Sequence, residues 1–139
     1  MNVNRLTRSL DFHAQALTLR SERQRIIASN IANADTPGYV AREMDFSAAL
    51  RAATGTQASA ARLDTPRPGH MGAGGSNDPT ATAMRFAAPS QTNLDGNTVD
   101  MDRERASFAE NAVKYEATLR FINGSVKTTL DAMKSHTQG

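Results

Sequence analysis

The chain has 139 residues, enough for one domain, and a formal net charge of +2. Hydrophobic residues make up 39% and aromatic residues 5%, below the roughly 45–50% apolar content of ordinary globular domains, so a deep self-sufficient core is not expected. The absence of Cys excludes disulfides, zinc–thiolate clusters and thiol catalysis. No apolar run reaches the ~20 residues of a membrane-spanning helix, and the N-terminus lacks the apolar stretch of a cleaved secretory signal.

Residues 1–33 are predicted to form the first unit, a long amphipathic helix. Pro and Gly are absent from about Asn4 to Asn30, and apolar residues recur at helical spacing over roughly 40 Å. The main apolar stripe contains Leu6, Leu10, Leu17 and Ile27. A second stripe contains Phe12, Leu19 and Ile26, which are spaced seven residues apart. A helix with two apolar faces needs more than one partner, and we expect assembly to supply the others.

Residues 34–99 are predicted to be a turn followed by an irregular segment. The zone from Arg51 to Asn97 holds 6 of the 9 Gly and 4 of the 5 Pro, a composition that favours a long loop. Such a loop is uncommon inside a compact domain, so we expect neighbouring subunits to pack against it. Within it, the Asp95-Gly96-Asn97 run is interpreted as a turn, because the other ligands of a calcium loop are missing.

Residues 100–139 are predicted to form a second, longer helix. Asp100 is suited to cap its N-terminus, while Asp102 and Glu104 complement the positive end of the helix dipole. A seam of period 3.5 contains Met101, Phe108, Ala112, Tyr115, Leu119, Ile122, Val126 and Met133. The predicted fold is therefore all-α. Long N- and C-terminal helices pair, parallel or antiparallel, as a coiled-coil-like core, joined by a long irregular Gly/Pro-rich middle segment.

No catalytic, cofactor or metal site is predicted. The three His residues lie in three different zones, and the sequence contains no HExxH motif, Gly-rich phosphate loop or GxSxG elbow. The carboxylates at the start of the second helix are explained by capping and the helix dipole. We therefore expect neither an enzyme nor a small-molecule substrate, and a wall-cleaving enzyme in particular lacks a credible acid/base pair.

A basic helical module that binds nucleic acid is the alternative from a different class. It is suggested by the sequence pI of 9.4 and by five Arg residues in the first 33 residues. These side chains do not form one clean face, and no aromatic residues alternate with them to stack on bases. A solvated or interface-paired helix face is the favoured interpretation, so no nucleic-acid partner is expected.

The stretch from 28 to 39, ASNIANADTPGY, resembles the N-terminal signature of the bacterial flagellar rod and hook proteins. Two further stretches, at 40–46 and from 95 to Tyr115, are similar to the proximal rod proteins of that family. The resemblance covers roughly two thirds of the chain. Within the signature, short Asn amides can bond backbone groups freed where the helix ends, and the Pro-Gly pair supplies a turn. The candidate assembly motif contains Asn30, Ile31, Ala32, Asn33, Thr36, Pro37, Gly38 and Tyr39.

The resemblance implies a structural subunit of the proximal rod of the flagellar basal body. Its terminal helices would pack with those of neighbours, link the membrane ring and export gate to the distal rod, and transmit torque. Its partners would be other copies of itself, other flagellar rod proteins, and membrane-ring and export-gate proteins. It would reach the periplasm-spanning rod through the flagellar type III export apparatus, without a cleaved signal peptide. Because its apolar stripes would be covered only by neighbouring subunits, we expect the isolated chain to be largely unfolded or partly helical.

Overall fold

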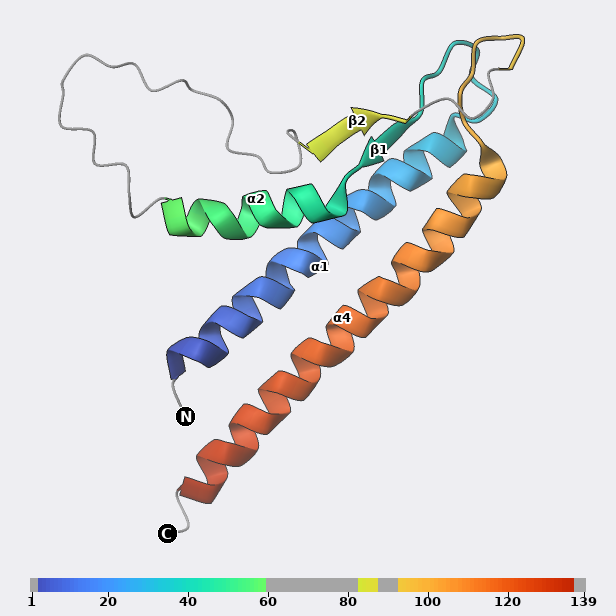
Figure 1. The fold of residues 1–139 in the computed structure, drawn as a ribbon. Coiled ribbons are helices and arrows are strands. Elements are labelled where there is room, and N and C mark those ends of the chain that lie inside the picture. Colours follow the sequence, from blue (N-terminus) through green and yellow to red (C-terminus); the bar gives the residue numbers. More distant parts are fainter. Residues whose placement is uncertain (1–2, 60–82, 88–92, 137–139) are drawn as a thin grey trace, which may run out of the picture.

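A computed structural model of the chain describes residues 3–59, 83–87 and 93–136. Two long helices dominate it, α1 (Val3–Ala32) and α4 (Met101–His136), and they lie side by side (Figure 1). Their pairing is antiparallel, since His13 stacks on Phe121 while Asn111, ten residues earlier in α4, bonds to Arg20 further along α1. The sequence leaves this direction open, and the structure decides it.

Local sequence explains where the two helices begin and end. α1 stops at Ala32, just before the Thr36-Pro37-Gly38 turn, in which Gly38 has a φ of +72°. The predicted cap of α4 is confirmed, because Asp100 Oδ1 accepts the N–H groups of Asp102 and Arg103, both at 3.1 Å. Gly124, inside α4, has open space where a side chain would project, so it marks no close packing among the described residues.

The all-α and irregular-middle predictions need correction within residues 34–99. A third helix, α2 (Phe46–Ser59), and a two-stranded antiparallel sheet of β1 (Arg42–Met44) and β2 (Met84–Phe86) lie there. α2 begins where Asp45 Oδ1 accepts the Ala48 N–H at 3.0 Å, an N-cap bond. Its sequence is rich in Ala, and the first Pro after it is Pro66, so residues 51–59 belong to the helix and not to the Gly/Pro-rich stretch.

A small core sits where α2 and the sheet cover one side of α1. It contains Leu19, Ile26, Met44, Ala49 and Ala83, with Phe46 and Leu50 packed against them. The second stripe of the first helix therefore finds an internal partner, which corrects the expectation that assembly alone would cover it. Only Phe12, at the start of that stripe, stays largely exposed.

Part of the predicted irregular segment falls outside the described residues, because residues 60–82 and 88–92 lie there. Within the described ranges, no helix is both long enough and apolar enough to cross a membrane.

Candidate assembly site

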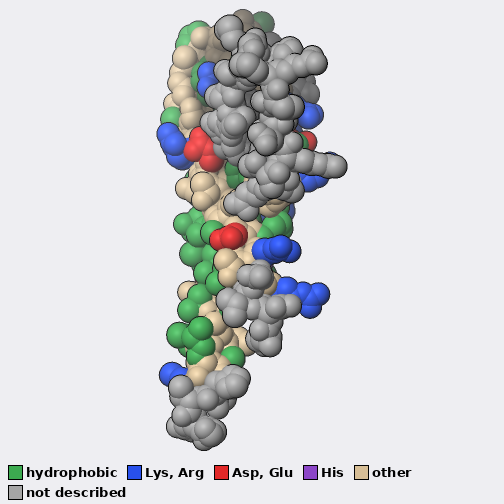
Figure 2. Space-filling view, turned by 90° about the vertical axis from the view of Figure 1, so that its left-hand side faces the viewer, with side chains coloured by type: hydrophobic (Ala, Val, Ile, Leu, Met, Phe, Trp, Pro, Cys, Tyr) green, Lys and Arg blue, Asp and Glu red, His purple; other side chains and the backbone are tan. Residues whose placement is uncertain are grey.

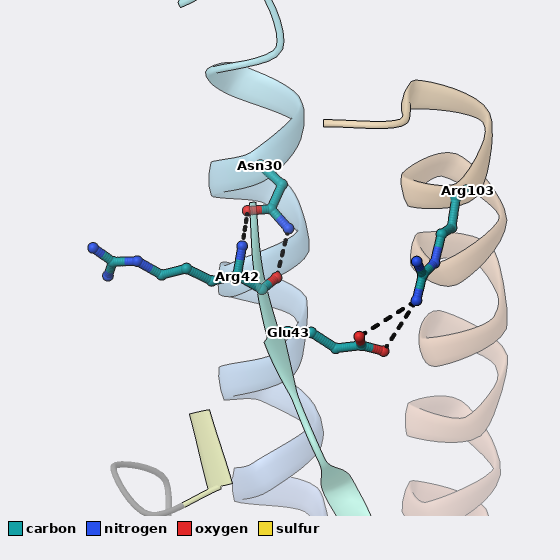
Figure 3. A network of polar contacts seen from close by, with 4 residues as sticks. All are labelled: Asn30, Arg42, Glu43 and Arg103. Carbon is teal, nitrogen blue, oxygen red and sulfur yellow. Dashed lines mark hydrogen bonds and ion pairs between the residues drawn. The ribbon is translucent and has the colours of Figure 1, made fainter. Parts of the chain in front are cut away.

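Asn30, near the end of α1, binds the backbone of β1. Its Nδ2 donates to the Arg42 carbonyl at 2.7 Å, and its Oδ1 accepts the Arg42 N–H at 3.0 Å (Figure 3). The Tyr39 hydroxyl donates to the same Oδ1 at 3.2 Å. With 1% of its surface exposed, the Asn30 amide takes the place of a neighbouring strand along the outer edge of β1.

Asn97 joins the turn after α1 to the segment that leads into α4. Its Nδ2 lies 2.8–2.9 Å from three backbone carbonyl oxygens, those of Asn33, Ala34 and Thr36. Its Oδ1 accepts the Val99 N–H at 2.8 Å. The side chain is fully buried, so each of these bonds replaces contact with water.

Backbone contacts close the same junction. The Gly38 N–H donates to the Asp95 carbonyl at 2.9 Å, and the Thr98 N–H donates to the Tyr39 carbonyl at 3.0 Å. Gly96 has a φ of +78° and lies close to Gly38. A Cβ added at Gly96 would be 3.7 Å from the Gly38 Cα, which is an ordinary van der Waals contact. We call residues 30–42 and 93–99, joined in this way, the clasp. It holds the adjacent ends of α1 and α4 together.

Charged side chains extend the clasp to the first turn of α4. Arg103 approaches Glu43 of β1 at 3.3 Å (Figure 3), an exposed pair that stabilises by roughly 1 kcal/mol at most. Glu104 is buried beside it, and this burial raises the pKa of its carboxyl above the usual value. A hydrogen bond from the Asn30 amide and the charge of Arg103 act in the opposite direction.

Much of the face that α4 turns toward α1 is polar. Asn111 is fully buried there, and its Nδ2 donates to the Arg20 carbonyl at 2.8 Å and to Gln24 Oε1 at 2.6 Å. Glu104 lies seven residues before it and Thr118 seven residues after it, and both are also buried. A buried Asn in a helix pair fixes the register at some expense of stability.

Most of the predicted seam of α4 is consequently left outside the helix pair. We call its exposed part, together with Leu130, the outer row: Phe108, Ala112, Leu119, Val126, Leu130 and Met133. Exposure reaches 51% at Leu130 and 61% at Met133. Figure 2 shows hydrophobic side chains in a column along one edge of the helical part of the molecule. An exposed apolar row of this length indicates a binding surface.

The other predicted seam and motif residues have mixed environments. Half-buried side chains of the two seams are Leu6, Leu10, Leu17, Met101, Tyr115 and Ile122, whereas Ile27 is buried. Within the motif, Asn33 Nδ2 donates to the Ser29 carbonyl at 2.8 Å, and Thr36 and Pro37 are exposed. The structure thus brings Asn30, Asn33 and Tyr39 together in the clasp and leaves Ala32 facing outward.

Comparisons with known proteins bear on what this surface serves. A family model described as "Flagella basal body rod protein" matches residues 10–39. "Flagellar basal body rod protein FlgB" of Escherichia coli (strain K12) is 41% identical over 136 residues, which span 96% of this chain and 98% of that protein. The chain belongs to the FlgB family of flagellar basal body rod proteins. Proteins of the same name from Proteus mirabilis (strain HI4320) and Cereibacter sphaeroides (strain ATCC 17029 / ATH 2.4.9) are 39% and 41% identical, covering 95% and 90% of this chain and 98% and 93% of theirs.

Membership of the FlgB family confirms the sequence resemblance. The match at residues 10–39 covers most of α1 and the first part of the clasp. The nucleic-acid alternative gains no support from the geometry, because Arg20 lies over the Phe46 ring at 4.2 Å and Arg25 pairs with Glu22 at 3.0 Å. In the part of the chain that the structure describes, no cluster of three or more potential metal-ligating side chains occurs.

Asn97 and Asn111 are the important residues that sequence reasoning missed in this FlgB-family chain. Asn97 stands in a predicted turn and in the stretch that resembles the rod proteins, but a lone Asn beside Gly carries no sign of its partners in residues 33–36. Asn111 does have a signal. It stands in a polar row at seven-residue spacing, Glu104, Asn111, Thr118 and Ser125, next to the apolar seam. Such a row is easily taken for a solvated face.

Proposed function

We propose that this FlgB-family chain is a structural subunit of the proximal rod, which links the membrane ring and export gate to the distal rod and transmits torque. The observation that carries the proposal is the outer row on α4. The α1–α4 pair is held in part by buried polar groups, while large apolar side chains of α4 point away from it. This distribution suits a helix that is covered by neighbouring subunits.

The energetics support assembly through the terminal helices. Full burial of one large aliphatic or aromatic side chain stabilises by about 1.5–3 kcal/mol. Five of the six outer-row side chains are of this kind and each is at least 37% exposed, so their coverage supplies a large part of an interface. Torque is then shared among many contacts along a helix and does not depend on one deep core.

The proposal assigns the signature two roles. Asn30, Asn33 and Tyr39 orient the end of α1 through bonds within the chain, while Ile31 and Ala32 contact neighbours. The partners are other copies of this chain, other rod proteins, and proteins of the membrane ring and export gate. The chain occupies the flagellar basal body, which it reaches through the flagellar type III export apparatus. In this role it acts as a building element and not as a catalyst.

Deletion and complementation test the proposal. Cells without the gene are expected to lack rods and filaments and to swim again when the wild-type gene is returned. Leu119→Asp, which places a carboxylate in the outer row, is expected to leave cells without rods, whereas Ala109→Asp, at an exposed site off the row, is expected to restore swimming. Normal rods in the deletion strain would overturn the proposed function. Steeply salt-dependent DNA binding by the purified chain would instead favour the nucleic-acid module.

A further inference from the structure

An open apolar groove lies between the end of α1 and the beginning of α4. Ala28, Ile31 and Ala32 of α1 form one wall, and Phe108 and Arg105 of α4 form the other. The groove has a volume of about 370 Å³, and its lining is almost entirely apolar apart from the Arg105 guanidinium. In the described ranges, no ion pair to Arg105 is present. The groove therefore offers an apolar floor beside a cation.

The clasp carries an exposed apolar side chain that suits such a groove. Leu94 is completely exposed in the turn between Asn93 and Asn97. The segment that carries this turn leads into the start of α4 (Figure 1), and the first turns of α4 form one wall of the groove. The Asn93 N–H donates to the Asn97 carbonyl at 3.1 Å, and the Gly96 N–H donates to the Asn93 carbonyl at 2.9 Å. The turn is also tied to Gly38 through the Asp95 carbonyl. The turn that carries Leu94 is closed by these backbone hydrogen bonds. Its backbone therefore loses little conformational entropy when the Leu94 side chain is buried in an interface.

Next to Leu94 stands a carboxylate that matches the cation of the groove. Asp95 is exposed, and its Oδ1 accepts the Asn97 N–H at 3.1 Å, which fixes its position in the turn. The turn therefore carries an apolar side chain followed by an anion, and the groove carries an apolar floor beside a cation. Complementary charges of this kind fix orientation and register at an interface more than they add affinity.

We propose that Leu94 of one copy of this chain inserts into the groove of a second copy, with Asp95 of the first facing Arg105 of the second. The inference rests on the proposed structural role and names the contact between copies. Turn and groove are different surfaces of the same chain, so the contact is heterologous. Each copy receives one neighbour and offers its turn to the next. Contacts of this type build rings or open helical arrays and not closed two-fold dimers.

Cysteine cross-linking tests the contact, because the natural chain contains no Cys. Two single variants, Leu94→Cys and Ala32→Cys, carrying different epitope tags, are expressed together in the deletion strain, and isolated basal bodies are oxidised. We expect a disulfide-linked dimer that carries both tags. The matched control replaces Ala32→Cys with Val113→Cys, a site that is 68% exposed and does not line the groove, and is expected to give no such dimer. Equal dimer yields from both pairs, or none from the first pair, would overturn the proposed contact.

Charge variants separate this inference from the proposed function. Arg105→Glu is expected to lower the yield of the Leu94–Ala32 cross-link by about fivefold, and Arg105→Lys to preserve most of it. Presence of the chain in basal bodies is scored independently by immunoblot. If the chain is incorporated but the cross-link is absent, so that a different protein occupies the groove, the contact is wrong while the structural role stands. If the chain is absent from basal bodies of swimming cells, the structural role itself fails.

Discussion

Replacing Asn97 should disconnect the two halves of the clasp. The Asn97 amide binds three carbonyls of residues 33–36 and the Val99 N–H, all at 2.8–2.9 Å, from a fully buried position. Asn97→Ala removes these bonds and leaves their partners without a protein replacement. Asn97→Asp keeps the acceptor for Val99 but turns a carboxylate oxygen toward the carbonyls, which adds repulsion to the lost bonds.

The expected loss of folding free energy on Asn97→Ala follows from the number of hydrogen bonds that the amide makes. An amide has two N–H groups and one acceptor oxygen, so Asn97→Ala removes about three full hydrogen bonds, each with a net contribution of about 1 kcal/mol. The predicted loss is about 3 kcal/mol, or about two orders of magnitude in the ratio of folded to unfolded chain. Asn97→Asp should lose more. Asn123→Ala, at an exposed site on α4, should change stability by no more than about 0.5 kcal/mol.

Folding induced by an osmolyte provides the assay, because it measures a folding free energy even for a chain that is largely unfolded in buffer. The purified chain is titrated with trimethylamine oxide while helical circular dichroism is recorded. The midpoint for Asn97→Ala should move to a higher osmolyte concentration than that of the wild type, and that for Asn123→Ala should stay in place. Coincident midpoints for Asn97→Ala and Asn123→Ala would refute the claim that Asn97 holds the two halves of the clasp together.

Three further outcomes are expected. Tyr115→Asp places a charge in the half-buried seam of α4 and should abolish rod assembly, whereas Tyr115→Phe should retain it. Normal swimming of the Asp variant would show that the seam is misplaced. Because burial raises the pKa of Glu104, its ionised form destabilises the fold above the usual carboxyl range and this penalty disappears as the pH falls. Glu104→Gln should therefore lower the osmolyte midpoint near about pH 7 and have little effect near about pH 4. An equal shift of the midpoint at both pH values would contradict the raised pKa of Glu104. The isolated wild-type chain should show no sharp thermal transition in calorimetry, and a cooperative melt of a monomer would count against this.

The terminal helices could be predicted because long periodic patterns carry their own evidence of helical structure. The N-terminal pattern without Pro or Gly gave α1 to within a residue of its observed end, and Asp100 marked the start of α4. β1 and β2 could not be predicted in the same way. Each has three residues, too few for an alternating pattern, and they meet only through contacts distant in sequence.

The packing of α4 against α1 was the less predictable part of the site. Periodicity finds an apolar stripe but does not say which partner covers it. The structure directs Asn111 and Thr118 inward and leaves Val126 outward, the reverse of what a simple helix pair would do. The prediction places residues 51–59 of α2 in the irregular segment because the Gly and Pro residues that follow them dominate the composition of 51–97, although the Asp45 cap and the Ala-rich run after it indicate a helix.

The accessibility of the outer row in free and assembled protein tests the central claim most directly. A Val126→Cys variant that supports swimming is treated with a maleimide, once as the purified chain and once within isolated basal bodies, and the labelling rates are compared. We predict fast labelling of the purified chain and strong protection in the basal body, because neighbouring helices cover this side chain there. Equally fast labelling in both would contradict the account.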